Sequence, residues 1–199
     1  MKQKSIKVNF IMNAILTMSS VIFPLITFPY VSRALQPAGI GKVNFAISVV
    51  SYFTMFAQLG IPTYGIRACA QVRDNKKELS KVVQELLWIS IFMCTISYLV
   101  FFLSIFFIPK FRKDYLLFII TGSSVLLNTI GVEWLYKGLE QYSYITVRSL
   151  IFKVIGIIAM LALVHRPADY IIYGGITVVA SYASYILNFM YLKKYVSLI

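Results

Sequence analysis

The sequence predicts an all-α, multi-pass membrane protein with six transmembrane helices. The 199 residues are 59% hydrophobic and 13% charged, whereas soluble domains carry about 25% charged residues. Five stretches contain no residue that is charged at neutral pH, and they hold 25, 24, 24, 18 and 23 residues. A helix needs about 20 mostly apolar residues to cross the hydrocarbon core of a bilayer, so each stretch is long enough for one crossing.

The first predicted span follows three N-terminal lysines. A signal peptide also begins with basic residues, but its apolar region is only about 7–15 residues long. The apolar run here holds 25 residues, which favours a retained helix. The fifth span is the weakest, because it contains Lys153. We expect residues 1–199 to form one six-helix domain, with spans at residues 8–31, 43–64, 86–108, 115–132, 149–164 and 170–191.

The basic residues are distributed unequally between the two sides of this predicted topology. Thirteen of the 19 Lys and Arg residues lie at the two termini, in the connections after the second and fourth spans, and at the start of the fifth span. Cytoplasmic segments carry such an excess, so both termini are predicted to be cytoplasmic. The net charge of +12 therefore flanks the spans. It forms no basic stripe with interleaved aromatics, and nucleic acid is not expected as a partner.

Polar residues form a stripe along the first predicted span. They recur every three or four positions, which places them on one face of a helix; they are Asn9, Asn13, Thr17, Ser20, Pro24 and Thr27. A polar face in a bilayer turns toward other helices or toward water. The stripe could pack helices together or line a water-filled pathway. Its length favours the pathway, so Asn13, Thr17 and Ser20 are candidates for substrate contact.

The other candidate site residues lie at the edges of the later spans or just inside them. Asn128 and Glu133 close the fourth span, and Arg33 and Arg148 flank the first and fifth. A guanidinium group binds phosphate through paired hydrogen bonds, although most such basic residues only set topology. Lys153 lies about one turn inside the fifth span. It either extends to the head groups or faces a cavity, and we favour the cavity.

The sequence shows no set of residues suited to catalysis or to metal binding. It has one histidine, two separated cysteines and seven dispersed carboxylates, which gives no cluster with metal-ligand spacing. The phosphate-binding pattern G-x-x-x-x-G-K-[ST] does not occur, so nucleotide hydrolysis by this chain is not expected. We therefore predict no enzyme activity, no cofactor and no metal site.

Two segments resemble a known family of membrane transporters. They are FPYVSRALQPAGIGKVNFA at residues 28–46 and EWLYKGLEQYSYITVRSLIFKVIGI at residues 133–157. Both are similar to the Wzx-type polysaccharide biosynthesis flippases, in the superfamily of multidrug, oligosaccharidyl-lipid and polysaccharide exporters. The resemblance also covers the Gly60-Ile61-Pro62 end of the second span and extends over nearly the whole chain.

The resemblance implies a function. Such flippases move undecaprenyl-pyrophosphate-linked oligosaccharide units across the bacterial inner membrane for O-antigen, capsule or exopolysaccharide synthesis. The family has two six-helix lobes, so this chain resembles an N-terminal lobe alone. The expected partners are the lipid-linked substrate, membrane lipids, a second six-helix lobe or a second copy of the chain, and the polysaccharide polymerase machinery.

Two alternatives remain from the sequence. A drug or cation exporter of the same superfamily would need an acidic residue deep in a span, and none of the predicted spans has one. The second alternative is an inactive remnant, or a helical partner subunit that transports nothing by itself.

Overall fold

The computed structural model describes residues 5–197, and all of its regular elements in that range are helical. They follow one another along the chain as α1 (Ile6–Gln58), α2 (Ile61–Gln71), α3 (Lys76–Phe107), α4 (Pro109–Lys113), α5 (Tyr115–Ile130), α6 (Glu133–Gly138), α7 (Tyr142–Leu163), the 3₁₀ turn η1 (Pro167–Asp169), α8 (Tyr170–Val178), the π-helical turn η2 (Val179–Ala183) and α9 (Ser184–Leu192). The predicted all-α class is confirmed.

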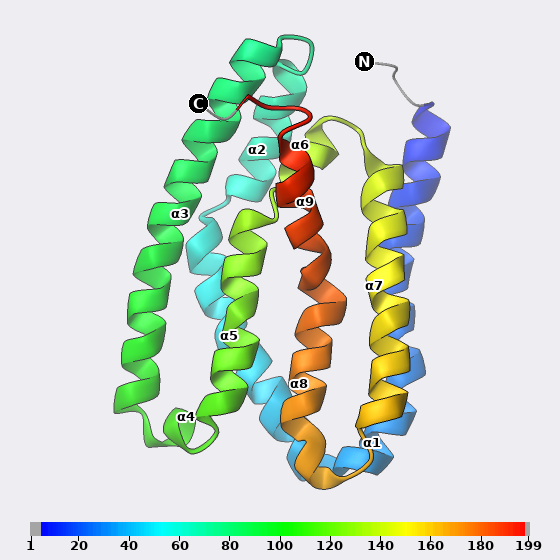
Figure 1. The fold of residues 1–199 in the computed structure, drawn as a ribbon, viewed down its shortest axis with the longest axis vertical. Helices are drawn as coiled ribbons and strands as arrows, with labels where there is room; N and C mark the ends of the chain where they lie inside the picture. Colours follow the sequence, from blue (N-terminus) through cyan, green and yellow to red (C-terminus); the bar gives the residue numbers. More distant parts are fainter. Residues whose placement is uncertain (1–4, 198–199) are drawn as a thin grey trace.

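Five helical segments within residues 5–197 are long and apolar enough to cross a membrane. The first of them, α1, consists of two helices joined at Gln36. We call residues 6–35 its first arm and residues 37–58 its second arm. Figure 1 shows the arms meeting at the end of the bundle opposite the N-terminus. The structure thus has the architecture of a multi-pass membrane protein, while the count of six separate crossings stays a prediction.

The bend in α1 lies at Gln36 and not at the two prolines of the first predicted span. Gln36 has φ 59° and ψ 169°, whereas Pro24 and Pro29 lie in helical backbone. A proline removes one hydrogen bond, but its own φ is compatible with a helix. Pro37 has a stronger effect on its neighbour, because a proline disfavours helical geometry at the preceding residue. The chain therefore turns at Gln36, between the predicted first and second spans.

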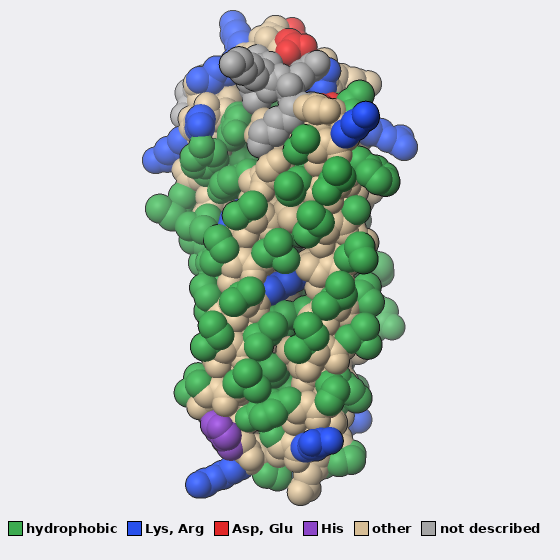
Figure 2. Space-filling model, turned by 90° about the vertical axis from the view of Figure 1, so that its right-hand side faces the viewer, with side chains coloured by type: hydrophobic (Ala, Val, Ile, Leu, Met, Phe, Trp, Pro, Cys, Tyr) green, Lys and Arg blue, Asp and Glu red, His purple; other side chains and the backbone are tan. Residues whose placement is uncertain are grey.

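The bundle is held by close contacts between helices and leaves apolar side chains on its outside. A Cβ atom on Gly156 of α7 would lie 2.6 Å from the Cβ atom of Ala180 in η2, so these segments pack at the smallest separation that their side chains allow. At the end near Gln36, the Lys42 Nζ atom lies 2.9 Å from the Asp114 carboxylate. Figure 2 shows the α1–α7 side of the molecule covered by hydrophobic side chains, with most charges at its two ends. Such an apolar exterior suits a lipid environment.

Several helix ends differ from the predicted spans. The helix α3 begins at Lys76, ten residues before the predicted third span, because Asn75 caps it by accepting hydrogen bonds from the amides of Lys77 and Glu78. Between the predicted fourth and fifth spans lies a short helix, α6, from Glu133 to Gly138. A break follows it, since Glu140 has φ 57°, and α7 begins at Tyr142, seven residues before the predicted fifth span.

Candidate functional site

Two breaks in the helical backbone, one between α1 and α2 and one between α5 and α6, lie close together in the bundle. The α1 helix ends at Gln58, Leu59 and Gly60 adopt positive φ values of 42° and 74°, and α2 then begins. Pro62 in the first turn of α2 suits a helix start, where its missing N–H has no helical partner. Between α5 and α6, Val132 has a φ of 39°, which is strained for a β-branched residue.

The segments after these breaks pack together. A Cβ atom on Gly65 of α2 would lie 2.7 Å from the Trp134 ring of α6. Within a bilayer, irregular backbone is tolerated only where it is buried in protein or lines a cavity. The paired breaks therefore mark a candidate site, and strain of this kind is often found at functional sites.

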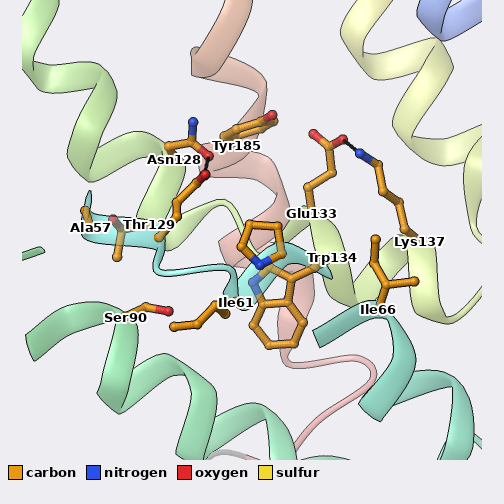
Figure 3. Close-up of a pocket in the computed structure, with 12 residues that line it drawn as sticks. Ala57, Ile61, Ile66, Ser90, Asn128, Thr129, Glu133, Trp134, Lys137 and Tyr185 are labelled. Atoms are coloured by element: carbon orange, nitrogen blue, oxygen red, sulfur yellow. Dashed lines mark hydrogen bonds and ion pairs between the residues drawn. The ribbon is translucent and has the colours of Figure 1, made fainter. Parts of the chain in front are cut away.

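A cavity of about 250 Å³ lies at the paired breaks, and we call it the break cavity. Figure 3 shows its lining, with Asn128 on one side and the Glu133–Lys137 ion pair on the other. The Lys137 Nζ atom lies 2.7 Å from the Glu133 carboxylate, and Gln58 donates a hydrogen bond of 2.6 Å to the Asn128 side-chain oxygen. The cavity thus combines a carboxylate, an ammonium group and two amides in one chamber.

A second cavity of about 250 Å³ adjoins the first, and Gln58 lines both. We call it the hydroxyl cavity, because its polar lining is mostly hydroxyl groups from α1, α5, α8 and η2: Ser51, Thr54, Thr121, Ser124, Thr177, Ser181 and Tyr182. Five of these hydroxyls donate to a carbonyl of their own helix. Their oxygens remain free to accept hydrogen bonds, so this cavity is suited to a ligand rich in hydroxyl donors.

The hydroxyl cavity also contains a local irregularity of the last long helical segment. Ser181 and Tyr182 belong to the π-helical turn η2. Single π-helical turns inside α-helices are frequent at functional sites. Here the extra residue in the turn shifts the face that α9 presents relative to α8, and Tyr185 of α9 reaches the break cavity.

Arg148 is buried beside the break cavity without an acceptor for its charge. It is 5% exposed, and none of its three guanidinium nitrogens has a hydrogen-bond partner among residues 5–197. Its guanidinium carbon lies 5.2 Å from the ring centre of Tyr144 and 5.9 Å from that of Tyr185. Cation–π contact offsets part of the desolvation cost, but a buried, unpaired charge remains unfavourable. An anion bound next to Arg148 would lower this cost, so the site is suited to anion binding.

Lys153 is placed elsewhere on α7. Its Nζ atom donates a hydrogen bond of 2.7 Å to the Ser19 hydroxyl on the first arm of α1. The pair lies in an open groove of about 360 Å³, which is lined otherwise by apolar side chains of α1 and α7. The prediction placed Lys153 one turn inside its helix, whereas α7 begins at Tyr142, so Lys153 lies near the middle of the helix.

The structure brings some of the predicted site residues together and leaves others apart. Asn128 and Glu133 line the break cavity, and Arg148 lies next to its Tyr185 wall. The remaining members of the predicted set on α1 are exposed and line neither the break cavity nor the hydroxyl cavity; they are Asn13, Thr17, Ser20 and Arg33. A pathway along the first arm of α1 therefore stays a prediction.

Among the residues that line the break cavity and that the prediction missed are Gln58, Lys137 and Tyr185. For Gln58 a signal existed, because it directly precedes the Leu59-Gly60 break and Pro62. Lys137 is four residues after Glu133, the spacing of an ion pair on one helix face. Nothing in the local sequence distinguishes Tyr185 from the other tyrosines of its helix, and only the packing of α9 identifies it.

Comparison with known proteins identifies the family. The family described as polysaccharide biosynthesis protein matches residues 6–197. The chain belongs to this family. It is similar to the "Putative O-antigen transporter" of Escherichia coli (strain K12), with 25% identity over 171 residues, which cover 85% of this chain and 41% of the relative.

A second relative agrees with the first. The "Putative O-antigen transporter" of Shigella dysenteriae is 25% identical over 154 residues, which cover 76% of this chain and 38% of the relative. The chain thus spans about two-fifths of the length of these curated relatives. No solved structure matches the chain. The family resemblance seen in the sequence is confirmed, and the five long apolar helical segments agree with a multi-pass membrane protein.

Proposed function

We propose that this chain is one helical lobe of a transporter that moves undecaprenyl-diphosphate-linked oligosaccharide units across the bacterial inner membrane, with both termini cytoplasmic. The single observation that carries the proposal is Arg148, a buried guanidinium with no acceptor among the described residues. Family membership and the names of the relatives agree with such a role.

The charge and burial of Arg148 fit the diphosphate part of this substrate. A diphosphate is doubly charged or more and offers several oxygens, so it can accept paired hydrogen bonds from a planar guanidinium. The cation–π contacts of Arg148 with the rings of Tyr144 and Tyr185 hold the guanidinium in place before the ligand arrives. Pre-organisation of this kind lowers the entropy cost of binding.

The two adjoining cavities fit the sugar part. Sugars carry many hydroxyl donors, and the hydroxyl cavity presents oxygens whose own protons are already used within helices. The break cavity adds the amides of Gln58 and Asn128, which both donate and accept. A polar head group could thus be held away from lipid while its hydrocarbon chain stays in the bilayer.

A second lobe is part of the proposal. The chain spans about two-fifths of the relatives, and the polar residues Asn13, Thr17 and Ser20 are exposed on the first arm of α1. An exposed polar stripe in the apolar part of a bilayer is unfavourable unless protein or water covers it. We propose that a separate six-helix lobe, or a second copy of this chain, covers the stripe and completes the pathway. The polymerase machinery would receive the product.

The test is export of polymer in cells that lack their own flippase, with this chain expressed alone and together with a candidate second lobe. Arg148→Ala should lower export about ten- to a hundredfold, the range expected for a lost hydrogen bond to a charged group. Arg148→Lys should restore only part of it, because an ammonium group cannot make the paired contact. The matched control is Arg112→Ala, an exposed arginine of α4.

A stability measurement separates this role from a structural one. Removing an unpaired buried charge should leave the stability of the purified chain unchanged or raise it. A purely structural arginine would instead show lower stability together with lower export. If Arg148→Ala exports normally at a normal protein level, the proposed function of this site is wrong.

A further inference from the structure

A hydrophobic groove runs along the outside of the bundle between α1 and α7, and it contains a single amine. Its walls are apolar residues such as Ile15, Ile22 and Ile26 on α1 and Leu150, Val154 and Ile157 on α7, and its volume is about 360 Å³. Figure 2 shows this face as mostly hydrophobic, with one basic side chain at mid-height between the helices. The amine of Lys153 is the basic group that lines the groove.

Lys153 lies too deep to reach the membrane surface. It is 11 residues after the start of α7 and 10 before its end, which is about 16 Å from either end at the rise of an α-helix. That distance exceeds the reach of a lysine side chain. The amine is also directed sideways, to the Ser19 hydroxyl of the neighbouring helix at 2.7 Å. Extension to the head groups therefore does not explain this residue.

The amine is only partly satisfied by its surroundings. Ser19 uses its own proton on the Leu16 carbonyl at 2.7 Å, so its oxygen accepts one of the three ammonium protons. No carboxylate of residues 5–197 forms an ion pair with Lys153. A charged group at mid-bilayer is unfavourable, because hydrocarbon cannot solvate it. A ligand that brings a negative charge to this depth would remove much of that cost.

The apolar groove and the amine together suit one kind of ligand, which is a long hydrocarbon chain that ends in a phosphate. Ordinary phospholipids keep their phosphates near the surface, about 15 Å from the midplane of the hydrocarbon core. A phosphate at the depth of Lys153 belongs to a lipid in transit across the membrane. We propose that the α1–α7 groove binds the polyprenyl chain of the diphosphate carrier lipid, with Lys153 as its phosphate contact midway across. This inference rests on the proposed function, since it takes the carrier lipid as substrate.

The site is distinct from Arg148, although both lie on α7. The two residues are five positions apart, so their side chains leave the helix about 140° apart. Arg148 faces Tyr185 of α9, whereas Lys153 faces Ser19 of α1. We assign the two groups to successive contacts of the same phosphate-bearing ligand, one beside the polar cavities and one on the lipid side.

The test measures lipid binding by the purified full chain in nanodiscs, by native mass spectrometry. The probes are undecaprenyl diphosphate, undecaprenol, which has the same chain without phosphate, and phosphatidylglycerol. The unmodified protein should bind undecaprenyl diphosphate about tenfold or more tightly than undecaprenol. The Lys153→Met variant should lose that preference but should still bind the polyprenyl chain of both probes. The Lys153→Arg variant should keep the preference. Phosphatidylglycerol should not compete.

A photo-crosslinking amino acid can locate the polyprenyl chain of the bound lipid. Placed at Ile22 in the groove it should capture the polyprenyl probe, and placed at Leu25, an exposed apolar residue of the same helix outside the groove, it should not. The inference is overturned if Lys153→Met keeps the preference for the diphosphate over the alcohol. It is also overturned if phosphatidylglycerol binds as strongly as undecaprenyl diphosphate. Normal export by Arg148→Ala would refute the proposed function but leave these binding results unchanged, so the two failures can be told apart.

Discussion

Gln58 donates a hydrogen bond of 2.6 Å to Asn128 and thereby joins the second arm of α1 to α5 where two cavities meet. Each residue lies just before a helix break, Gln58 ahead of Leu59 and Asn128 ahead of Val132. The bond thus fixes the two breaks relative to one another. Its loss should affect both the stability of the bundle and the shape of the cavities.

We expect Gln58→Leu and Asn128→Leu to destabilise the chain, because each leaves the other amide without its partner. The double variant should be less destabilised than the sum of the single ones. The coupling free energy should be about 0.6 kcal/mol, the average for hydrogen bonds between membrane helices. Reversible unfolding in mixed detergent micelles measures it, and additive effects of the two changes would show that the bond contributes nothing.

The bend of α1 offers a prediction about backbone strain. Gln36 has φ 59° and ψ 169°, a region that glycine adopts readily and other residues only at a cost of about 1–3 kcal/mol. Gln36→Gly should therefore stabilise the fold by about 1 kcal/mol. Ala38→Gly, two residues later in helical backbone, is the matched control and should destabilise it by a similar amount. If Gln36→Gly and Ala38→Gly change the unfolding midpoint equally, the backbone at Gln36 is not strained.

The contact between Gly156 and Ala180 predicts a compensating pair. A Cβ atom on Gly156 would lie 2.6 Å from that of Ala180, so Gly156→Ala should push α7 away from η2 and cost about 1–3 kcal/mol. Adding Ala180→Gly should recover much of the loss by reopening the space. Gly41→Ala is the control, since nothing lies within 4 Å of its added Cβ atom. The free energy of unfolding of the unmodified chain and of these three variants tests the prediction. Failure of Ala180→Gly to rescue Gly156→Ala would argue against this packing.

Asp114 predicts how stability changes with pH. Burial would raise the pKa of its carboxyl group, but hydrogen bonds from Lys42 and Tyr170 and the charges of Lys42 and Lys113 outweigh burial and lower the pKa. A carboxyl group whose pKa is lower in the folded state stabilises that state above its unfolded pKa. This contribution is lost as the pH falls below about 4 and through the folded pKa.

Unfolding of the chain at several pH values checks the Asp114 prediction. The free energy of unfolding of the unmodified chain should fall more steeply on acidification than that of Asp114→Asn. The two chains should converge at a pH below the folded pKa of Asp114, where neither side chain is charged. Parallel curves over the whole acidic range would show that the Lys42–Asp114 pair at 2.9 Å adds no stability.

Part of the site could be predicted from the sequence because it depends on residue type and spacing along one helix. Glu133 and Asn128 stand out as polar groups at the end of an apolar run, and Arg148 and Lys153 stand out as charges in or beside one. Gln58 was visible only as a polar residue before a glycine and a proline. Tyr185 gave no signal, since its role comes from the π-helical turn that precedes it and from the placement of α9 against α6 and α7.

By itself, the sequence determined that the chain is an all-helical membrane protein and which family it resembles. Both follow from local properties: the length of apolar stretches against the thickness of a bilayer, and residue patterns within single segments. Tertiary structure alone decided that Arg148 is buried without an acceptor, that Lys153 meets Ser19 in a groove, and that the breaks after Gln58 and before Glu133 share one cavity. The reason is physical: each of these relations joins helices that are distant in sequence, and its geometry depends on how those helices pack.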